Sequence, residues 1–419
     1  GPVVARRGAV GSRRARIAVG ATRPRGRGRT SDRVADAQES SDDGAAPAGL
    51  EEVLAALARD PASAAAQARG CGALLEVAKR SQETFAAGAA QALVAAAAAH
   101  PGDRRVQLAA GAAMERFCAR HMKNVLLLLE LDGVSAVVGA MKAFAGEQAL
   151  QEIGCKLLCN AAACNPDCQA RVVASGGVQA VLGAMAGHVE AAAVQELGCR
   201  ALRELAAYSP AAQEAIVARG GIQRVLRAME AHGKLAGIQA LGCGVLRNLT
   251  ACSAEHQEAV VSRNGVQVVI DAMLAHPDVA DVQCAGCWAL FCLCVHNVET
   301  ARAVEAHGAV KAALAAMEVH RGEPRVQEAG CWVIKEFGKR IATAHSRTTF
   351  VACAQAAMKA MDKHGAVVSV QTAAGGALRS LAAHDSSGWV QTVCLGRMGR
   401  FGRSTTKRTL SVIKECDDA

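Results

Sequence analysis

The sequence predicts an all-α protein, a solenoid of about eight stacked units of 44 residues with three helices each. Two series of residues carry that prediction, because glutamines and methionines both recur at an interval of 44 residues. The glutamines are Gln107, Gln151, Gln195, Gln239, Gln283, Gln327 and Gln371, and the methionines are Met141, Met185, Met229, Met273, Met317 and Met361. A fixed period of this length is typical of one supersecondary unit that buries its apolar face on its neighbours.

The composition indicates that these units are helical. Hydrophobic residues make up 51% of the chain but aromatic residues only 3%, so the apolar side chains are chiefly Ala, Val and Leu. Ala is the strongest intrinsic helix former, and the alternating Val, Ile, Thr and Tyr stretches that would indicate strands are almost absent. Small side chains also suit closely packed helices.

The chain divides into three segments along its length. Residues 1–48 contain Arg, Gly, Ser and Ala without helical periodicity and are predicted to be disordered. Residues 49–384 form the predicted solenoid, and residues 385–419 lose the repeat register and form a basic C-terminal tail. Counting from Gln67 gives eight units, of which the first lacks a clear short helix, as expected of a terminal cap, and the last is degraded.

Turn signals separate three helices within a middle unit, residues 211–252. Gly220 and Gly221 end a short first helix, and a second helix of similar length ends near Gly233. The longer third helix has an apolar stripe of helical period that includes Gly242. Glycine recurs at this position at residues 70, 154, 198, 286 and 330. Because glycine inside a helix costs about 1 kcal/mol relative to Ala, the recurrence predicts a close contact that a larger side chain would force apart.

Six of the 17 cysteines share one position, four residues after the glutamine. They are Cys71, Cys155, Cys199, Cys243, Cys287 and Cys331. Equivalent positions on neighbouring helices lie about 10 Å apart, whereas a disulfide needs Cα atoms within about 7 Å. We therefore expect reduced thiols in the core and an intracellular, reducing location, with the cytoplasm favoured.

The formal charge of +9 is concentrated in residues 1–33, which hold ten arginines and only one acidic residue, Asp32. Three interpretations of this segment are open: an organelle transit peptide, a disordered arm that neutralises nucleic-acid phosphates, and a solubilising tail. Nucleic acid would bind only through residues 1–33. No run reaches the roughly 18 apolar residues of a membrane span.

The repeated phrase resembles a known family. The phrase VQELGCRALREL at residues 194–205, the helix start GGIQRVLRAM and the endings RNL and CNA are similar to the armadillo repeat. Over roughly residues 50–384, the wording is also similar to algal-type armadillo arrays and to the armadillo region of leucine-rich-repeat kinases. The resemblance implies a right-handed superhelix whose third helices line a concave groove that binds extended peptides or partner proteins. A likeness of fold does not name the partner.

Positions one, five, eight and nine residues after each glutamine lie opposite the apolar stripe and would face such a groove. The candidate partner-binding residues at these positions are Asn160, Arg200, Arg203, Arg247, Asn248, Trp288, Trp332, Lys335 and Arg379. In importin-α-like armadillo proteins, which this sequence resembles, a Trp at the fifth position and an Asn at the ninth hold a basic peptide. No unit here combines the two residues, so the sequence does not predict recognition of a basic localisation peptide.

Each candidate also has a structural alternative. Asn amides bridge the N–H and C=O groups of a peptide, and exposed Trp offers apolar or cation–π contact, but Trp288 and Trp332 can equally pack between repeats. The arginines can bind acidic segments. Glutamates such as Glu196 and Glu204 stand beside them, so charge pairs on a solvated helix are the alternative.

Other clusters do not predict chemistry. Cys284, Cys287, Cys292, Cys294 and His296 begin with CxxC spacing, but this spacing falls inside a helix, where thiolates do not converge on zinc as they do at a turn. Cys155, Cys159, Cys164 and Cys168 are discounted for the same reason. Histidines recur at His100, His188, His232, His276, His320 and His364, at helix ends, where they are expected to cap the last carbonyls. No catalytic motif occurs.

The sequence therefore predicts a non-enzymatic scaffold or adaptor that binds an extended protein or peptide segment in its groove. We expect a monomer without cofactor or metal. The alternative is a nucleic-acid-associated protein anchored by its arginine-rich N-terminal arm.

Overall fold

The computed structural model describes residues 49–80, 87–119, 121–295, 297–340, 347–383 and residue 390, and within them every regular element is an α-helix. The predicted disordered segment 1–48 and nearly all of the predicted tail 385–419 lie outside the described residues. The 21 described helices form eight units, each ending in a long helix that carries one of the repeated glutamines. We call this long helix the third helix throughout.

Five units contain three helices each. They are α5 (Met122–Glu130), α6 (Gly133–Ala143) and α7 (Gln148–Ala162); α8 (Pro166–Ala174), α9 (Gly177–Gly187) and α10 (Ala192–Ala206); α11 (Pro210–Ala218), α12 (Gly221–Ala231) and α13 (Ala236–Thr250); α14 (Ala254–Val261), α15 (Gly265–Ala275) and α16 (Ala280–Cys294); and α17 (Val298–Ala306), α18 (Ala309–Val319) and α19 (Pro324–Gly338). They are units 3 to 7.

The terminal units have two described helices each. They are α1 (Leu50–Arg59) with α2 (Ala64–Arg80), α3 (Ala87–Ala99) with α4 (Arg104–Cys118), and α20 (Arg347–Lys363) with α21 (Val368–Ala382). The prediction of three helices per unit therefore holds for units 3 to 7, while in units 1, 2 and 8 the described residues show a pair.

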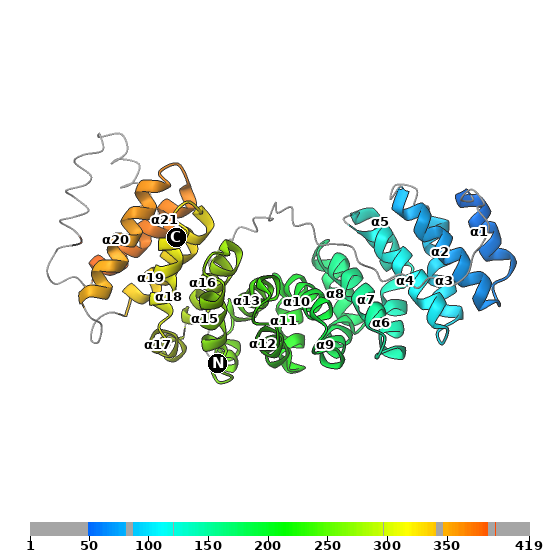
Figure 1. The fold of residues 1–419 in the computed structure, drawn as a ribbon, viewed down its shortest axis with the longest axis horizontal. Helices are drawn as coiled ribbons and strands as arrows, with labels where there is room; N and C mark the ends of the chain where they lie inside the picture. The colour runs from blue at the N-terminus through cyan, green and yellow to red at the C-terminus, as the bar shows by residue number, and fades with distance from the viewer. Residues whose placement is uncertain are drawn as a thin grey trace, which may run out of the picture.

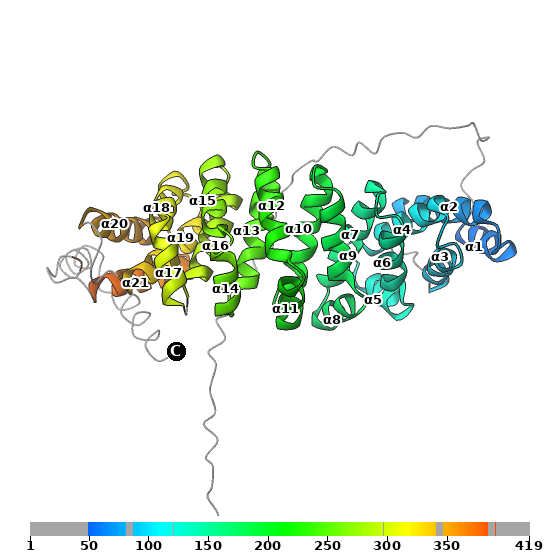
Figure 2. The same cartoon turned by 90° about the horizontal axis from the view of Figure 1, so that it is seen from below.

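The units stack side by side into a bowed rod (Figure 1). Each third helix packs on the third helices of the units before and after it, so α7, α10, α13, α16 and α19 follow one another along the inner side of the bow. The first and second helices cover the outer side, which faces the viewer in Figure 2. The predicted solenoid is confirmed, and its inner wall is built from third helices.

The repeated glycine lets the second helix pack directly on the third helix of its own unit. A β-carbon on Gly198 would lie 2.5 Å from Cγ of Met185, and the same collision recurs between the other glycines of the series and their methionines. These pairs are Gly154 with Met141, Gly242 with Met229, Gly286 with Met273, and Gly330 with Met317. The predicted close contact is present, and the side chain that occupies it comes from the methionine series.

Each repeated glutamine joins the same two helices through hydrogen bonds. Nε2 of Gln195 donates to the carbonyl oxygen of Met185 at 2.9 Å and to that of His188 at 2.7 Å. All eight units repeat this pair of bonds, to the residues ten and seven positions earlier. The last carbonyls of a helix have no hydrogen-bond partner within that helix. A buried glutamine amide that donates to them therefore stabilises the end of every second helix.

The repeated histidines differ from the prediction. They stand at the ends of the second helices, as expected, but their rings do not cap those ends. Nε2 of His232 lies 2.8 Å from the carbonyl oxygen of Val189, in the turn of the preceding unit, and five further histidines bond 39 or 43 residues back in the same way. The physical reason is that the glutamine already satisfies the local carbonyls. Each histidine therefore links two units.

The repeated cysteines lie in the core as free thiols, as predicted. All six are fully buried, and burial raises the pKa of Cys199 and Cys243 to about 12. Among the described helices, none alone is long and apolar enough to cross a membrane, although α5 and α6, bent by 78°, have the length and composition together.

Replacing Gln195 by Ala should lower the free energy of unfolding by about 2 kcal/mol, because two backbone carbonyls lose their partner. Urea denaturation followed by circular dichroism measures this. Gln223→Ala, an exposed glutamine on α12 in the next unit, is the control and should leave the midpoint unchanged. Equal midpoints for both variants would contradict the role given to the glutamine series.

Replacing either of two glycines of unit 4 by Ala should change the free energy of unfolding, in opposite directions for the two positions. Gly198→Ala should destabilise by about 1 to 3 kcal/mol, since the new methyl group meets Met185. Gly183→Ala, on exposed α9 surface where a β-carbon meets nothing within 4 Å, should stabilise by up to about 1 kcal/mol. Thermal unfolding of both variants checks the sign, and a stabilised Gly198→Ala protein would refute the packing account.

Candidate binding groove on the inner face

The candidate residues lie on six successive third helices along the inner side of the rod. Asn160 is on α7, Arg200 and Arg203 on α10, Arg247 and Asn248 on α13, Trp288 on α16, Trp332 and Lys335 on α19, and Arg379 on α21. Apart from the exposed Arg200, all are half-buried. The cause is the stacking of the units, since each side chain emerges between its own third helix and a neighbouring one.

The two asparagines differ in how far their amides are engaged. Nδ2 of Asn248 donates to the carbonyl oxygen of Arg203 at 3.0 Å, which ties α13 to α10. Its Oδ1 accepts from Nε and Nη2 of Arg247 at 3.2 and 3.1 Å. The side-chain amide of Asn160, in contrast, has no hydrogen-bond partner within the described part of the chain. Asn160 therefore keeps its full hydrogen-bonding capacity, whereas Asn248 keeps one amide hydrogen.

Two of the arginines are paired with glutamates of their own helix. Nη2 of Arg200 lies 2.7 Å from Oε1 of Glu196, and Nη2 of Arg203 lies 2.7 Å from Oε1 of Glu204. The exposed pair of Arg200 and Glu196 contributes only about 0 to 1 kcal/mol to stability, so a stronger ligand can displace it, whereas the pair of Arg203 and Glu204 is half-buried. The structural alternative considered for these arginines is present in the fold.

A row of aromatic side chains crosses from α16 to α19. The ring centroids of Trp288 and Phe291 are 5.6 Å apart in an edge-to-face arrangement, and those of Phe291 and Trp332 are 5.4 Å apart. Nζ of Lys335 stands 4.3 Å from the centroid of the Trp332 ring. Packing between repeats is therefore part of the role of both tryptophans, and one face of Trp332 is already covered by a cation.

A residue that the sequence reasoning did not single out, Arg340, links third helices further along the groove. Its Nη2 donates to the carbonyl oxygen of Cys294 at the end of α16, at 2.8 Å, and its Nη1 donates to the carbonyl oxygen of Glu336 at 2.9 Å. The buried Glu336 carboxylate accepts from Lys339 at 2.6 Å. Glu336 occupies the same repeat position as Asn248, nine residues after the glutamine. Asn248 links units 4 and 5, and the cluster of Glu336, Lys339 and Arg340 links units 6 and 7 in its place. No repeated motif marks Arg340 in the sequence.

The cysteine clusters do not converge. Among the described residues, no three His, Cys, Asp or Glu side chains come together as metal ligands would. Burial raises the pKa of Cys292 and Cys294 to about 12, and Sγ of Cys284 lies 3.6 Å from the carbonyl oxygen of Arg325. His296, the remaining member of that cluster, lies outside the described residues.

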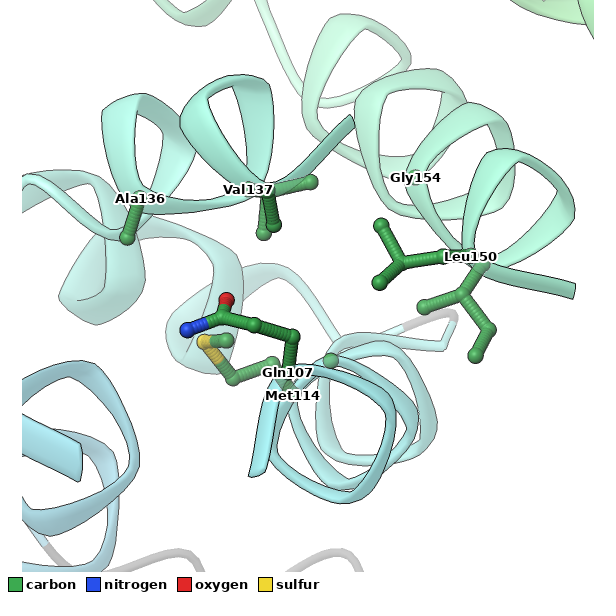
Figure 3. A pocket seen from close by; sticks show the side chains of 9 residues that line it. Gln107, Met114, Ala136, Val137, Leu150 and Gly154 are labelled. Atoms are coloured by element: carbon green, nitrogen blue, oxygen red, sulfur yellow. The ribbon is translucent and has the colours of Figure 1, made fainter. Parts of the chain in front are cut away.

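Two hollows in the rod lie away from the candidate residues. A cavity of about 10 Å³ between α4, α6 and α7, lined by Gln107, Val137 and Leu150 among others, is a packing seam with room for at most a water (Figure 3). A cleft of about 760 Å³ lies between α18 and α20. Glu318 at this cleft pairs with Arg321 and with Lys359, so opposite charges there already compensate one another.

Comparison with known proteins gives the following matches. A family model described as LRRK2 ARM repeat matches residues 71–393. The crystal structure of an engineered protein superposes with a TM-score of 0.63 at 18% identity, covering 88% of this chain and 95% of that one. A designed armadillo repeat protein superposes with a TM-score of 0.50 at 13% identity, covering 56% of this chain and 94% of that one. At such identities the likeness shows the fold alone. No curated protein matches the sequence.

The thiols should react in an order set by burial. Cys252 is exposed, whereas burial raises the pKa of Cys243 to about 12 and so keeps it a protonated thiol near pH 8. We expect N-ethylmaleimide to modify Cys252 in the native protein and to reach Cys243 only after urea unfolding, with peptide mass spectrometry locating each adduct. Equal labelling of both residues in the native state would contradict the burial described above.

Proposed function

Because this chain belongs to the armadillo repeat family matched by the LRRK2 ARM repeat model, we propose that it is a non-enzymatic scaffold whose inner groove holds an extended segment of a partner protein. Armadillo solenoids commonly mediate protein binding, and stacked units of this kind present long concave surfaces. The unit spacing suits an extended segment, since successive third helices offer the same positions at regular intervals along the rod.

The observation that carries the proposal is the uncommitted amide of Asn160. This half-buried amide has no hydrogen-bond partner among the described residues, so its donor and acceptor groups are open to a ligand. A peptide backbone supplies the complementary N–H and C=O groups, and an asparagine amide bonds to both at once. Asn248 adds one further donor two units along. We therefore assign main-chain binding to Asn160, with Asn248 in support.

Side-chain selection falls to the remaining candidates. The half-buried Trp288 and Trp332 offer apolar surface, and Arg200, Arg203, Arg247, Lys335 and Arg379 supply positive charge along the groove. The buried thiols fit a protein of a reducing compartment such as the cytoplasm.

Joint replacement of Asn160 and Trp288 by Ala should reduce capture of partner proteins at least about tenfold, because central Trp and hydrogen-bonding residues dominate interface energies. The measurement is affinity purification from native cell extract with the full chain as bait, followed by quantitative mass spectrometry. Gln223→Ala, on the outer helix α12, is the matched control and should capture the wild-type set. Circular dichroism verifies that both variants remain folded.

The proposal fails if the Asn160→Ala, Trp288→Ala protein captures the same proteins in the same amounts as wild type. It also fails if Gln223→Ala removes them and the double variant does not, because the partner would then bind the outer surface.

A further inference from the structure

Units 4 and 5 place an arginine at the same position on the inner face but give it different partners. In unit 4, Nε and Nη2 of Arg203 both donate to Oε1 of Glu204, at 3.1 and 2.7 Å. In unit 5, Nε and Nη2 of Arg247 both donate to Oδ1 of Asn248, at 3.2 and 3.1 Å. The geometry is the same, but a carboxylate neutralises the first guanidinium, whereas a neutral amide leaves the charge of the second one uncompensated.

Two carboxylates, Asp281 and Glu328, act on Cys284 as Arg247 does, but neither forms an ion pair with Arg247 among the described residues. Within the described part of the chain no carboxylate forms an ion pair with Arg247. The positive charge of Arg247 acts on Cys284 and Cys292 of the next third helix, α16. Burial raises the pKa of both thiols, that of Cys292 to about 12, so both thiols stay neutral. Asp281, the acidic residue at the start of that helix, pairs with Arg325 at 3.1 Å. A half-buried cation exerts a stronger attraction than an exposed one.

Trp288 adds an apolar surface beside this charge. Trp288 lies on α16 between Cys284 and Cys292, four residues from each, so the three side chains share one face of the helix. The charge of Arg247 acts on both cysteines of that face. In unit 5 the equivalent position is Gly244, over which the stem of Arg203 lies, since a β-carbon there would be 3.0 Å from Cδ of Arg203. At α13 the groove therefore changes from arginines paired with glutamates to an arginine that has no counter-ion among the described residues and that reaches toward the helix of Trp288.

We infer that Arg247 is the carboxylate-binding position of the groove, and that the partner segment carries an Asp or Glu side chain there and an apolar side chain on Trp288. The inference rests on the proposed function and adds the chemistry of the partner. Third helices pack about 10 Å apart, and an extended chain rises about 3.3 Å per residue. The acidic and apolar residues of the segment therefore stand at most about three positions apart, since Arg247 reaches toward α16.

Phage-displayed random dodecapeptides, selected on the immobilised full chain, provide a probe that presumes no partner. We expect enriched peptides to pair an acidic with an apolar residue. For a synthetic enriched peptide, changing its acid to the amide should weaken binding about tenfold or more, as expected for a lost charge-assisted hydrogen bond. Arg247→Gln should bind the acidic peptide as weakly as wild type binds the amide form.

Two further variants test the comparison between units without changing Arg247. Asn248→Glu installs the carboxylate that unit 4 has, and should lower affinity for the acidic peptide about tenfold more than affinity for its amide form, since both peptides lose the Asn248 amide equally. Glu204→Gln frees Arg203 and should enrich peptides with a second acid. Arg227→Gln, which removes an exposed charge on the outer helix α12, is the control and should match wild type. Circular dichroism confirms folding of each variant.

The outcomes separate the two proposals. Enriched peptides without an acidic preference, or an acidic preference that Arg247→Gln retains, would overturn the inference and leave groove binding standing. If no peptide is enriched, and the extract proteins are captured equally by wild type and the Asn160→Ala, Trp288→Ala variant, groove binding itself is wrong.

Discussion

The interlock between the second and third helices of each unit is the contact on which the rest of the structure depends. A glutamine amide satisfies the last carbonyls of the second helix, and a glycine on the third helix gives a methionine of the second the space to pack. Both contacts need side chains at a fixed separation within the unit, which explains why the glutamine and methionine series stay in step. Units of one shape then stack in one way, and histidines such as His232 reach back to the preceding turn to join them.

This interlock leaves the inner face of the third helices free to vary. The fifth position after the glutamine, for example, is Arg200, Gly244 and Trp288 in three successive units, whereas the glutamine does not change. The same face also joins the units, because Asn248 bonds to the backbone of α10 and Arg340 bonds to that of α16. Binding and stacking therefore share side chains on this surface. Asn160 and Arg247 stand out because, among the described residues, the amide of one has no partner and the charge of the other has no counter-ion.

Sequence reasoning predicted what depends on spacing along one chain. The helical units, the buried thiols and the close contact at Gly198 follow from periodicity and residue size alone. It also placed the histidines at helix ends but assigned their rings to the wrong carbonyls, since His232 bonds 43 residues back. Contacts across units depend on how far one third helix advances past the next, which no local pattern encodes. The Arg340 link and the bond from Asn248 to the backbone of Arg203 were therefore beyond the sequence.

The central claim is that partners bind along the inner wall of this rod, and site-specific photo-cross-linking tests it most directly. A benzoylphenylalanine introduced at Lys156, an exposed inner position on α7 one turn from Asn160, should form covalent adducts with proteins of a native extract on illumination. The same residue at Gln223 on the outer helix α12 should form few. Adducts from Gln223 in the absence of adducts from Lys156 would contradict the account.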